Sequence, residues 1–318
     1  MSKAISTTWP WTTIGLTIER IIQEALTLGC DEICIRATDG PTQYGLGATT
    51  KLRWAGRTQH DLERAAKAAG LATSIWCPIT LVNPAGEAAA IREAADFYNP
   101  PAIYIDAESS AKKNIVNLGA FLRALGRLRA RVLVQSYRRA DLHGEMAWRK
   151  WLTYKDDQGS YIVDGLAPQM YPIGVHGATR WITDLSKALL SQDRECAAAA
   201  RPDMPWWPTM PAFIGGTFEG QTTPWAPEPE DLLAAVEWLK GALGERLRGL
   251  NFWSLDRHLV KLPELAVAIA TIQMGAAVPV VPPAVPAMPG PSDPEKVARM
   301  WGHHVNGGHM GIGGDLLG

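Results

Sequence analysis

Short apolar runs alternate with helix-like stretches along the first 273 residues of the chain. Eight runs have the length and apolar content of strands. Each is followed by a stretch in which apolar residues recur every three or four positions, as on one face of a helix. The predicted strands are 4–8, 31–37, 71–77, 102–106, 131–136, 163–170, 206–212 and 248–254, and the predicted helices are 14–28, 57–69, 85–97, 111–128, 144–156, 177–191, 229–243 and 262–273.

This order of elements predicts an α/β fold, a (β/α)8 TIM barrel, because repeated strand–helix units form parallel sheets and eight of them fit this length. Gly29 and Gly70 end the first two helices, and Pro84 opens the third. The first strand is short and polar, and prolines interrupt the seventh. A doubly wound open sheet is therefore the alternative.

The chain changes character near residue 275. We expect three parts: the (β/α)8 barrel over 1–274, a linker over 275–294 and a docking tail over 295–318. The linker is rich in proline, which favours an extended, semi-rigid chain. The tail has too few apolar residues for a domain of its own, so we expect it to bind a protein partner or a second copy.

Composition narrows the choice of ligand. A net charge of -1 gives no general electrostatic attraction to nucleic acid or to an anionic membrane. No stretch has the roughly 18 apolar residues that span a membrane, and the first residues lack the apolar core of a signal peptide. We therefore expect synthesis in the cytoplasm, with export, if any, by another route. Thirteen Trp against five Phe slightly favour carbohydrate, because indole rings stack on sugar faces.

Neither cysteine nor histidine spacing indicates a metal or a cofactor. The four cysteines match no disulfide framework and no paired zinc motif, so we expect buried thiols. Three histidines lie in the glycine-rich tail, but no cysteine or carboxylate completes a ligand set beside them. They are His303, His304 and His309.

Two carboxylates follow one another at the end of the predicted fourth strand. Asp106 is its last residue, and Glu108 comes two positions later. Side chains at positions i and i+2 of a strand point to the same side, so the two should project together. Like charges this close raise at least one pKa, which keeps a carboxylic acid protonated near neutral pH, as a glycosidase requires. The alternative is that Glu108 only stabilises the start of the next helix.

Further polar and aromatic residues fall at the other predicted strand ends, which meet at one mouth of a TIM barrel. Acids, amides, phenols and indoles there predict a site that binds hydroxyl groups and stacks on a ring. Each also has a structural alternative, such as pairing of an acid with a base or packing over the core. The set is Arg36, Asp39, Trp76, Asp106, Glu108, Gln135, Tyr137, Gln169, Tyr171, Trp253 and Asp256.

Two families of glycosidase resemble parts of this sequence. GCDEICIRATDG at 29–40, AGL at 69–71, SIW at 74–76 and IDAE at 105–108 look like glycoside hydrolase family 25 lysozymes. APQMY at 167–171 and NFWS at 251–254 are similar to family 18 chitinases.

The resemblance implies specific roles. Glu108 would protonate the glycosidic oxygen, and Asp106 would orient the N-acetyl group of the substrate, which attacks the anomeric carbon. Tyr171 would bind the acetyl oxygen, and Trp253 would lie under the sugar. The remaining candidates would line the substrate site.

Two functional hypotheses follow. The first is a muramidase-type hydrolase of peptidoglycan or a related amino-sugar glycan, encoded by a phage as a lysin or virion component. The second is a non-catalytic barrel that serves a phage particle as a structural or glycan-binding protein. Family 25 members carry an Asp on the first strand, whereas this chain has Ser6, Thr7, Thr8 and Trp9 there, which favours the second hypothesis. The presence of the Asp106–Glu108 pair favours the first.

Overall fold

The computed structural model describes residues 1–7, 16–43, 59–215, 225–255 and 261–275. Eight of the strands in these residues are parallel and form a closed barrel in the order β1-β10-β9-β8-β7-β6-β5-β2. The predicted TIM barrel is confirmed, and the open sheet is excluded. The strands are β1 (Ser2–Ser6), β2 (Glu32–Arg36), β5 (Ala72–Ile79), β6 (Ala102–Ala107), β7 (Arg131–Tyr137), β8 (Gly165–Gln169), β9 (Thr209–Pro211) and β10 (Gly249–Trp253), with a small antiparallel pair, β3 (Thr38–Asp39) and β4 (Thr42–Gln43), beside them.

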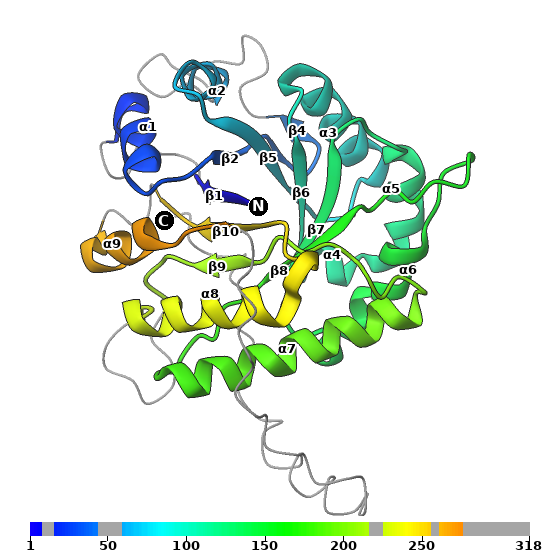
Figure 1. Ribbon diagram of the computed structural model, residues 1–318. Helices are drawn as coiled ribbons and strands as arrows, with labels where there is room; N and C mark the ends of the chain where they lie inside the picture. The colour runs from blue at the N-terminus through cyan, green and yellow to red at the C-terminus, as the bar shows by residue number, and fades with distance from the viewer. Residues whose placement is uncertain (8–15, 44–58, 216–224, 256–260, 276–318) are drawn as a thin grey trace, which may run out of the picture.

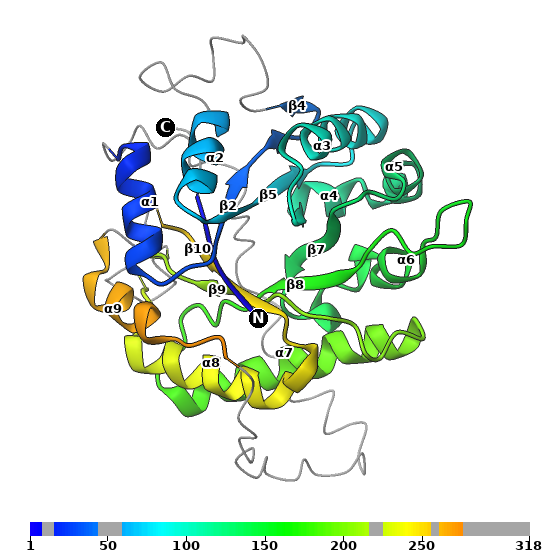
Figure 2. The same cartoon turned by 45° about the horizontal axis from the view of Figure 1, so that its top comes forward.

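Helices form a ring around the barrel, with α7 and α8 side by side on one flank (Figures 1 and 2). Their ends follow local sequence signals, such as Thr17 accepting a hydrogen bond from the Arg20 amide at the start of α1. The helices are α1 (Ile18–Thr27), α2 (Gln59–Ala68), α3 (Pro84–Tyr98), α4 (Ser109–Lys113), α5 (Leu118–Leu125), α6 (Trp148–Thr153), α7 (Ala178–Ala198), α8 (Pro229–Leu243) and α9 (Pro263–Thr271).

Two predicted helices differ from the observed ones. The stretch 111–128 is not one helix, because Asn114 and Asn117 donate side-chain hydrogen bonds to the carbonyls of Thr80 and Leu81, and a 3-10 turn separates α4 from α5. The stretch 144–156 begins with another 3-10 turn, and α6 covers only six residues of it. The seventh strand, β9, has three residues, as its prolines suggested.

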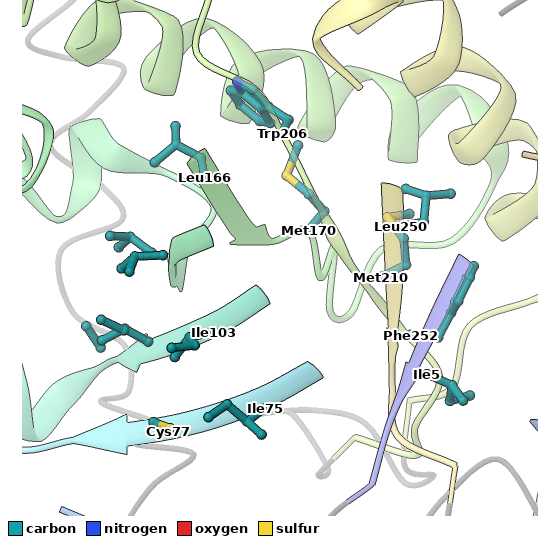
Figure 3. Close-up of a cluster of buried hydrophobic side chains, with 14 of the residues drawn as sticks. Ile5, Ile75, Cys77, Ile103, Leu166, Met170, Trp206, Met210, Leu250 and Phe252 are labelled. Carbon is teal, nitrogen blue, oxygen red and sulfur yellow. The ribbon is translucent and has the colours of Figure 1, made fainter. Parts of the chain in front are cut away.

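Alternating strand residues create two layers of core. Side chains on the outer face of the barrel, such as Ile5, Ile75 and Ile103, belong to one large cluster with the buried side chains of the helices. Figure 3 shows these three residues on their strands. Side chains on the inner face fill the lumen with a separate cluster that includes Cys34, Tyr104 and Leu133. The period of two along each strand explains both layers.

Trp207 fills the amino end of the lumen. A Cβ atom on Gly165 would lie 2.6 Å from the Trp207 ring, and one on Gly249 would lie 2.8 Å from it, so both strands need glycine there. The Arg131 guanidinium lies 5.2 Å from the centre of the same ring. This end is therefore closed by packed side chains.

The remaining structural predictions have mixed outcomes. All four cysteines are buried and free, as predicted. Within the described ranges, no cluster of His, Cys, Asp and Glu could hold a metal ion, and no helix has the length and apolarity to cross a membrane. The linker and tail, with their histidines, lie outside the described residues apart from residue 275, so the division of the chain stays a prediction.

Candidate active site

Asp106 and Glu108 share one hydrogen-bond donor at the carboxyl end of the barrel. Asp106 is the last inward-facing residue of β6, and Glu108 lies just beyond the strand. The Gln169 amide nitrogen, at the end of β8, donates to Glu108 Oε1 at 2.5 Å and to Asp106 Oδ1 at 3.2 Å. Glu108 stands at the first position before α4, but its side chain makes no capping bond. The carboxylate therefore turns toward the mouth.

Both carboxyl groups have a raised pKa. Burial is the main cause for each, and the charge of Glu108 raises the pKa of Asp106 further. Opposing this, Arg36 lowers the pKa of Asp106, and the Gln169 amide lowers the pKa of both. The pKa of Asp106 is raised well above its usual value, further than that of Glu108, so the two acids hold one proton between them as a pair.

Tyr171 lies two residues beyond the end of β8 and is 7% exposed. Burial raises the pKa of its hydroxyl, and so do the charges of Asp106 and Glu108, which places the phenol close to the acid pair. Its ring packs edge-on against Phe213 at a centroid distance of 5.1 Å. A neutral phenol in this position can donate a hydrogen bond to a ligand held by the two acids.

Tyr137 lies at the end of β7, the strand between β6 with Asp106 and β8 with Gln169. Its hydroxyl shares a 3.1 Å hydrogen bond with Ser109, the residue after Glu108. His143 stacks on its ring at 3.8 Å, and the Lys112 ammonium lies over the ring at 5.7 Å. The ring and the hydroxyl of Tyr137 are thus both in contact with other residues of the protein.

The two candidate indoles differ in exposure. Trp76 is 5% exposed and donates from Nε1 to the Thr7 carbonyl at 2.9 Å, which fits a packing role. Trp253, at the end of β10, is partly exposed and meets the Trp76 ring edge-on at 4.8 Å. Trp76 therefore supports Trp253, which offers the indole surface at the mouth.

The other candidates occupy less direct positions. Asp39 is largely exposed and forms an ion pair with Arg36 at 3.0 Å, the pairing considered as its alternative. Gln135 is 2% exposed and aligned with Asp106 on the neighbouring strand, and its Oε1 has no partner among the described residues. Asp256 lies outside the described residues.

Sequence reasoning missed three residues that connect the end of β7 to α7, next to this site. Arg138 follows Tyr137 directly, and it contacts Asp184 of α7 at 2.9 Å. Gln192 of the same helix is fully buried. A signal for them was available in the sequence of α7, where Asp184 and Gln192, eight positions apart, are polar residues on the side of the helix that carries its apolar residues.

Comparison with known proteins supports the fold. No family model matches the chain, and no curated protein matches its sequence. A chitinase from Chromobacterium violaceum has a similar structure, with a TM-score of 0.54 and 11% identity over 85% of this chain and 98% of that one. A GH18 chitinase from Pseudoalteromonas aurantia has a TM-score of 0.53 and 12% identity over 84% of this chain and 100% of that one.

The spore cortex-lytic enzyme SleL from Bacillus cereus is also similar, with a TM-score of 0.52 and 11% identity over 85% of this chain and 74% of that one. At these identities the comparisons establish a shared barrel fold. One of the three neighbours is a GH18 chitinase, which is the family that the APQMY and NFWS segments resemble. Membership of family 25 is not shown.

Proposed function

We propose that this protein is a glycoside hydrolase that acts on glycans containing N-acetylated amino sugars. The observation that carries the proposal is the acid pair, Asp106 and Glu108, joined through one amide of Gln169 at the carboxyl end of the barrel. TIM-barrel enzymes place their chemistry at this end. The raised pKa of each carboxyl group fits an acid that must donate a proton near neutral pH.

In the proposed reaction, Glu108 takes the proton that the pair shares and donates it to the glycosidic oxygen as the bond to the anomeric carbon breaks. The acetyl oxygen of the substrate attacks that carbon and forms a cyclic oxazolinium ion. Ionised Asp106 stabilises the positive charge on its nitrogen, and the Tyr171 hydroxyl orients the acetyl group. Glu108, now a carboxylate, then takes a proton from the water that opens the ring.

The structural neighbours support this substrate class by their names, which are those of chitinases and of a spore cortex-lytic enzyme. Chitin and peptidoglycan both contain N-acetylated amino sugars. Muramidase-type specificity and a place in a phage particle stay predictions from the sequence.

A non-catalytic, glycan-binding barrel is the second candidate, and the end of β1 favours it. Ser6 lies where family 25 lysozymes carry an Asp, and its hydroxyl donates to Asn251 Oδ1 at 3.0 Å inside the lumen. A hydroxyl cannot replace a carboxylate. This candidate keeps the same mouth but predicts binding without hydrolysis.

Hydrolysis of defined glycans separates the two candidates. The wild type and Glu108→Gln are incubated with chito-oligosaccharides and with peptidoglycan, and reducing ends are counted. Glu145→Gln is the matched control. Glu145 is an exposed carboxylate at the same end of the barrel, where it forms an ion pair with Lys112. We expect cleavage by the wild type and the control but not by Glu108→Gln. Binding of both glycans without cleavage would establish the second candidate, and full activity of Glu108→Gln would place the acid elsewhere.

A further inference from the structure

Tyr171 lies beyond the part of β8 that pairs with β7. The last aligned residues of the two strands are Tyr137 and Gln169. Past that point the backbone turns away: the Met170 amide donates to the Thr209 carbonyl of β9, and the Tyr171 amide donates back to Gln169. The pairing of β7 with β8 therefore ends just before Tyr171, whose hydroxyl is close enough to the acid pair to be affected by its charges.

Beyond the last paired residues, the ends of β7 and β8 are connected by a side chain. Arg138, the first residue after β7, donates from Nη1 to the Tyr171 carbonyl at 2.5 Å. Its guanidinium also lies against Asp184 of α7, with 2.9 Å between Nε and Oδ2 and 3.5 Å between Nη2 and Oδ1. Both side chains are mostly buried, with 28% and 22% exposed. The ion pair with Asp184 and the hydrogen bond to the Tyr171 carbonyl together restrict the position of the guanidinium.

The same helix holds the backbone from which Arg138 projects. Gln192 donates from Nε2 to the carbonyls of Tyr137, at 2.9 Å, and Arg138, at 3.3 Å. Positions 184 and 192 are eight residues apart, which brings both to the barrel-facing side of α7. One helix thus fixes the end of β7 and, through Arg138, the backbone of Tyr171.

We propose that Arg138 and Asp184 are positioning residues that set the Tyr171 hydroxyl against the acid pair and thereby control turnover. This inference rests on the proposed function in one respect, the contact of Tyr171 with the acetyl group. The pair acts through geometry, because the contacts described for Arg138 and Asp184 join them to each other and Arg138 to the Tyr171 carbonyl. Loosening the pair should therefore change the rate and leave its pH dependence in place.

The kinetic test uses Asp184→Asn and Arg138→Lys, which keep size but weaken the contact. We expect kcat on a chito-oligosaccharide to fall on the order of 10- to 100-fold, as for a small misplacement of a reacting group, with KM and the pH profile unchanged. In a Tyr171→Phe background the same substitutions should have little further effect. Arg139→Lys, which loosens the neighbouring pair with Asp141, is the control. Full additivity with Tyr171→Phe, or a shifted pH profile, would overturn the proposal.

A second measurement needs no activity. Protein labelled with 3-fluorotyrosine gives a fluorine signal for Tyr171, assigned by its loss in Tyr171→Phe. We expect this signal to shift and broaden in Asp184→Asn and Arg138→Lys, while it stays unchanged in Arg139→Lys. An unchanged Tyr171 signal in both variants would overturn the proposal whether or not the wild type cleaves a glycan. If the signal moves but no glycan is cleaved, the positioning role stands and the proposed function fails.

Discussion

Glu32 and Glu108 show how differently the two ends of one lumen use a carboxyl group. Glu32 lies at the amino end, is 4% exposed, and has a raised pKa mainly because of burial. Glu108 lies at the carboxyl end, also with a pKa raised by burial, yet it is partly exposed and paired with Asp106 through Gln169. A raised pKa is thus common to both ends. Access and a partner acid distinguish a candidate active site from a buried structural group.

Packing explains the difference in access. At the amino end, Trp207 occupies the space that Gly165 and Gly249 leave free. At the carboxyl end, the inward positions carry polar side chains of intermediate exposure, such as Asp106 and Gln169. The barrel therefore separates an amino half closed by packed side chains from a carboxyl half that holds the candidate site.

The largest expected effect contrasts the two glutamates directly. Glu108→Gln should lower hydrolysis on the order of 100- to 10,000-fold, because an amide cannot act as a general acid. Glu32→Gln, at the amino end of the lumen, should leave kcat unchanged. Initial rates on a chito-oligosaccharide measure both. A comparable loss in Glu32→Gln would mean that the two ends are functionally coupled and would break the comparison.

Removal of the ring that seals the amino end should cost stability and little activity. Trp207→Ala should lower the free energy of unfolding by about 3–5 kcal/mol, the range for deleting a large buried aromatic side chain. Trp207→Phe, which refills most of the volume, should recover part of this loss. Urea unfolding measures both variants. Unchanged stability of Trp207→Ala would show that the amino end is not a packed seal.

A smaller effect is expected from one methyl group at the same place. Gly165→Ala would put a Cβ atom 2.6 Å from the Trp207 ring and 2.9 Å from the Pro205 carbonyl. Such overpacking costs about 1–3 kcal/mol. Gly144→Ala is the matched control, because no atom lies within 4 Å of a Cβ there. Equal midpoints of urea unfolding for the two variants would contradict the packing described for this end.

The smallest effect is a pH dependence of stability. The folded protein raises the pKa of Glu32 above its unfolded value, so the folded state binds the proton more strongly. Stability from this group is fully present below the unfolded pKa and decreases as the pH rises toward the folded value. Glu32→Gln should lack this decrease, so its melting temperature relative to the wild type should rise from pH 4 to pH 8. A constant difference would show that Glu32 does not titrate as described.

Sequence patterns predicted the barrel well because its signals are local. Eight strand–helix alternations are visible in the sequence, and the i, i+2 spacing of Asp106 and Glu108 determines their common side. The bond from Gln169 to both acids was not visible, because it joins residues 61 and 63 positions apart. Their joint placement at the mouth follows from closure of the barrel.

Other features depend on contacts that no local pattern records. The fit of Trp207 between two glycines requires three strands to meet, and the break after α4 depends on Asn114 bonding to the carbonyl of Thr80 in an earlier loop. The link from Arg138 to Tyr171 likewise depends on the position of α7. Sequence reasoning could name the chemistry of the mouth but not the residues that support it.

A crystal structure of Glu108→Gln with a bound chito-oligosaccharide tests the central claim most directly, because it requires binding at the mouth but no turnover. The account predicts a sugar ring over Trp253, with its acetyl group near Asp106 and Tyr171 and a glycosidic oxygen within hydrogen-bond distance of the residue 108 amide. An oligosaccharide bound elsewhere on the barrel, with the mouth around Asp106 free of sugar, would contradict it.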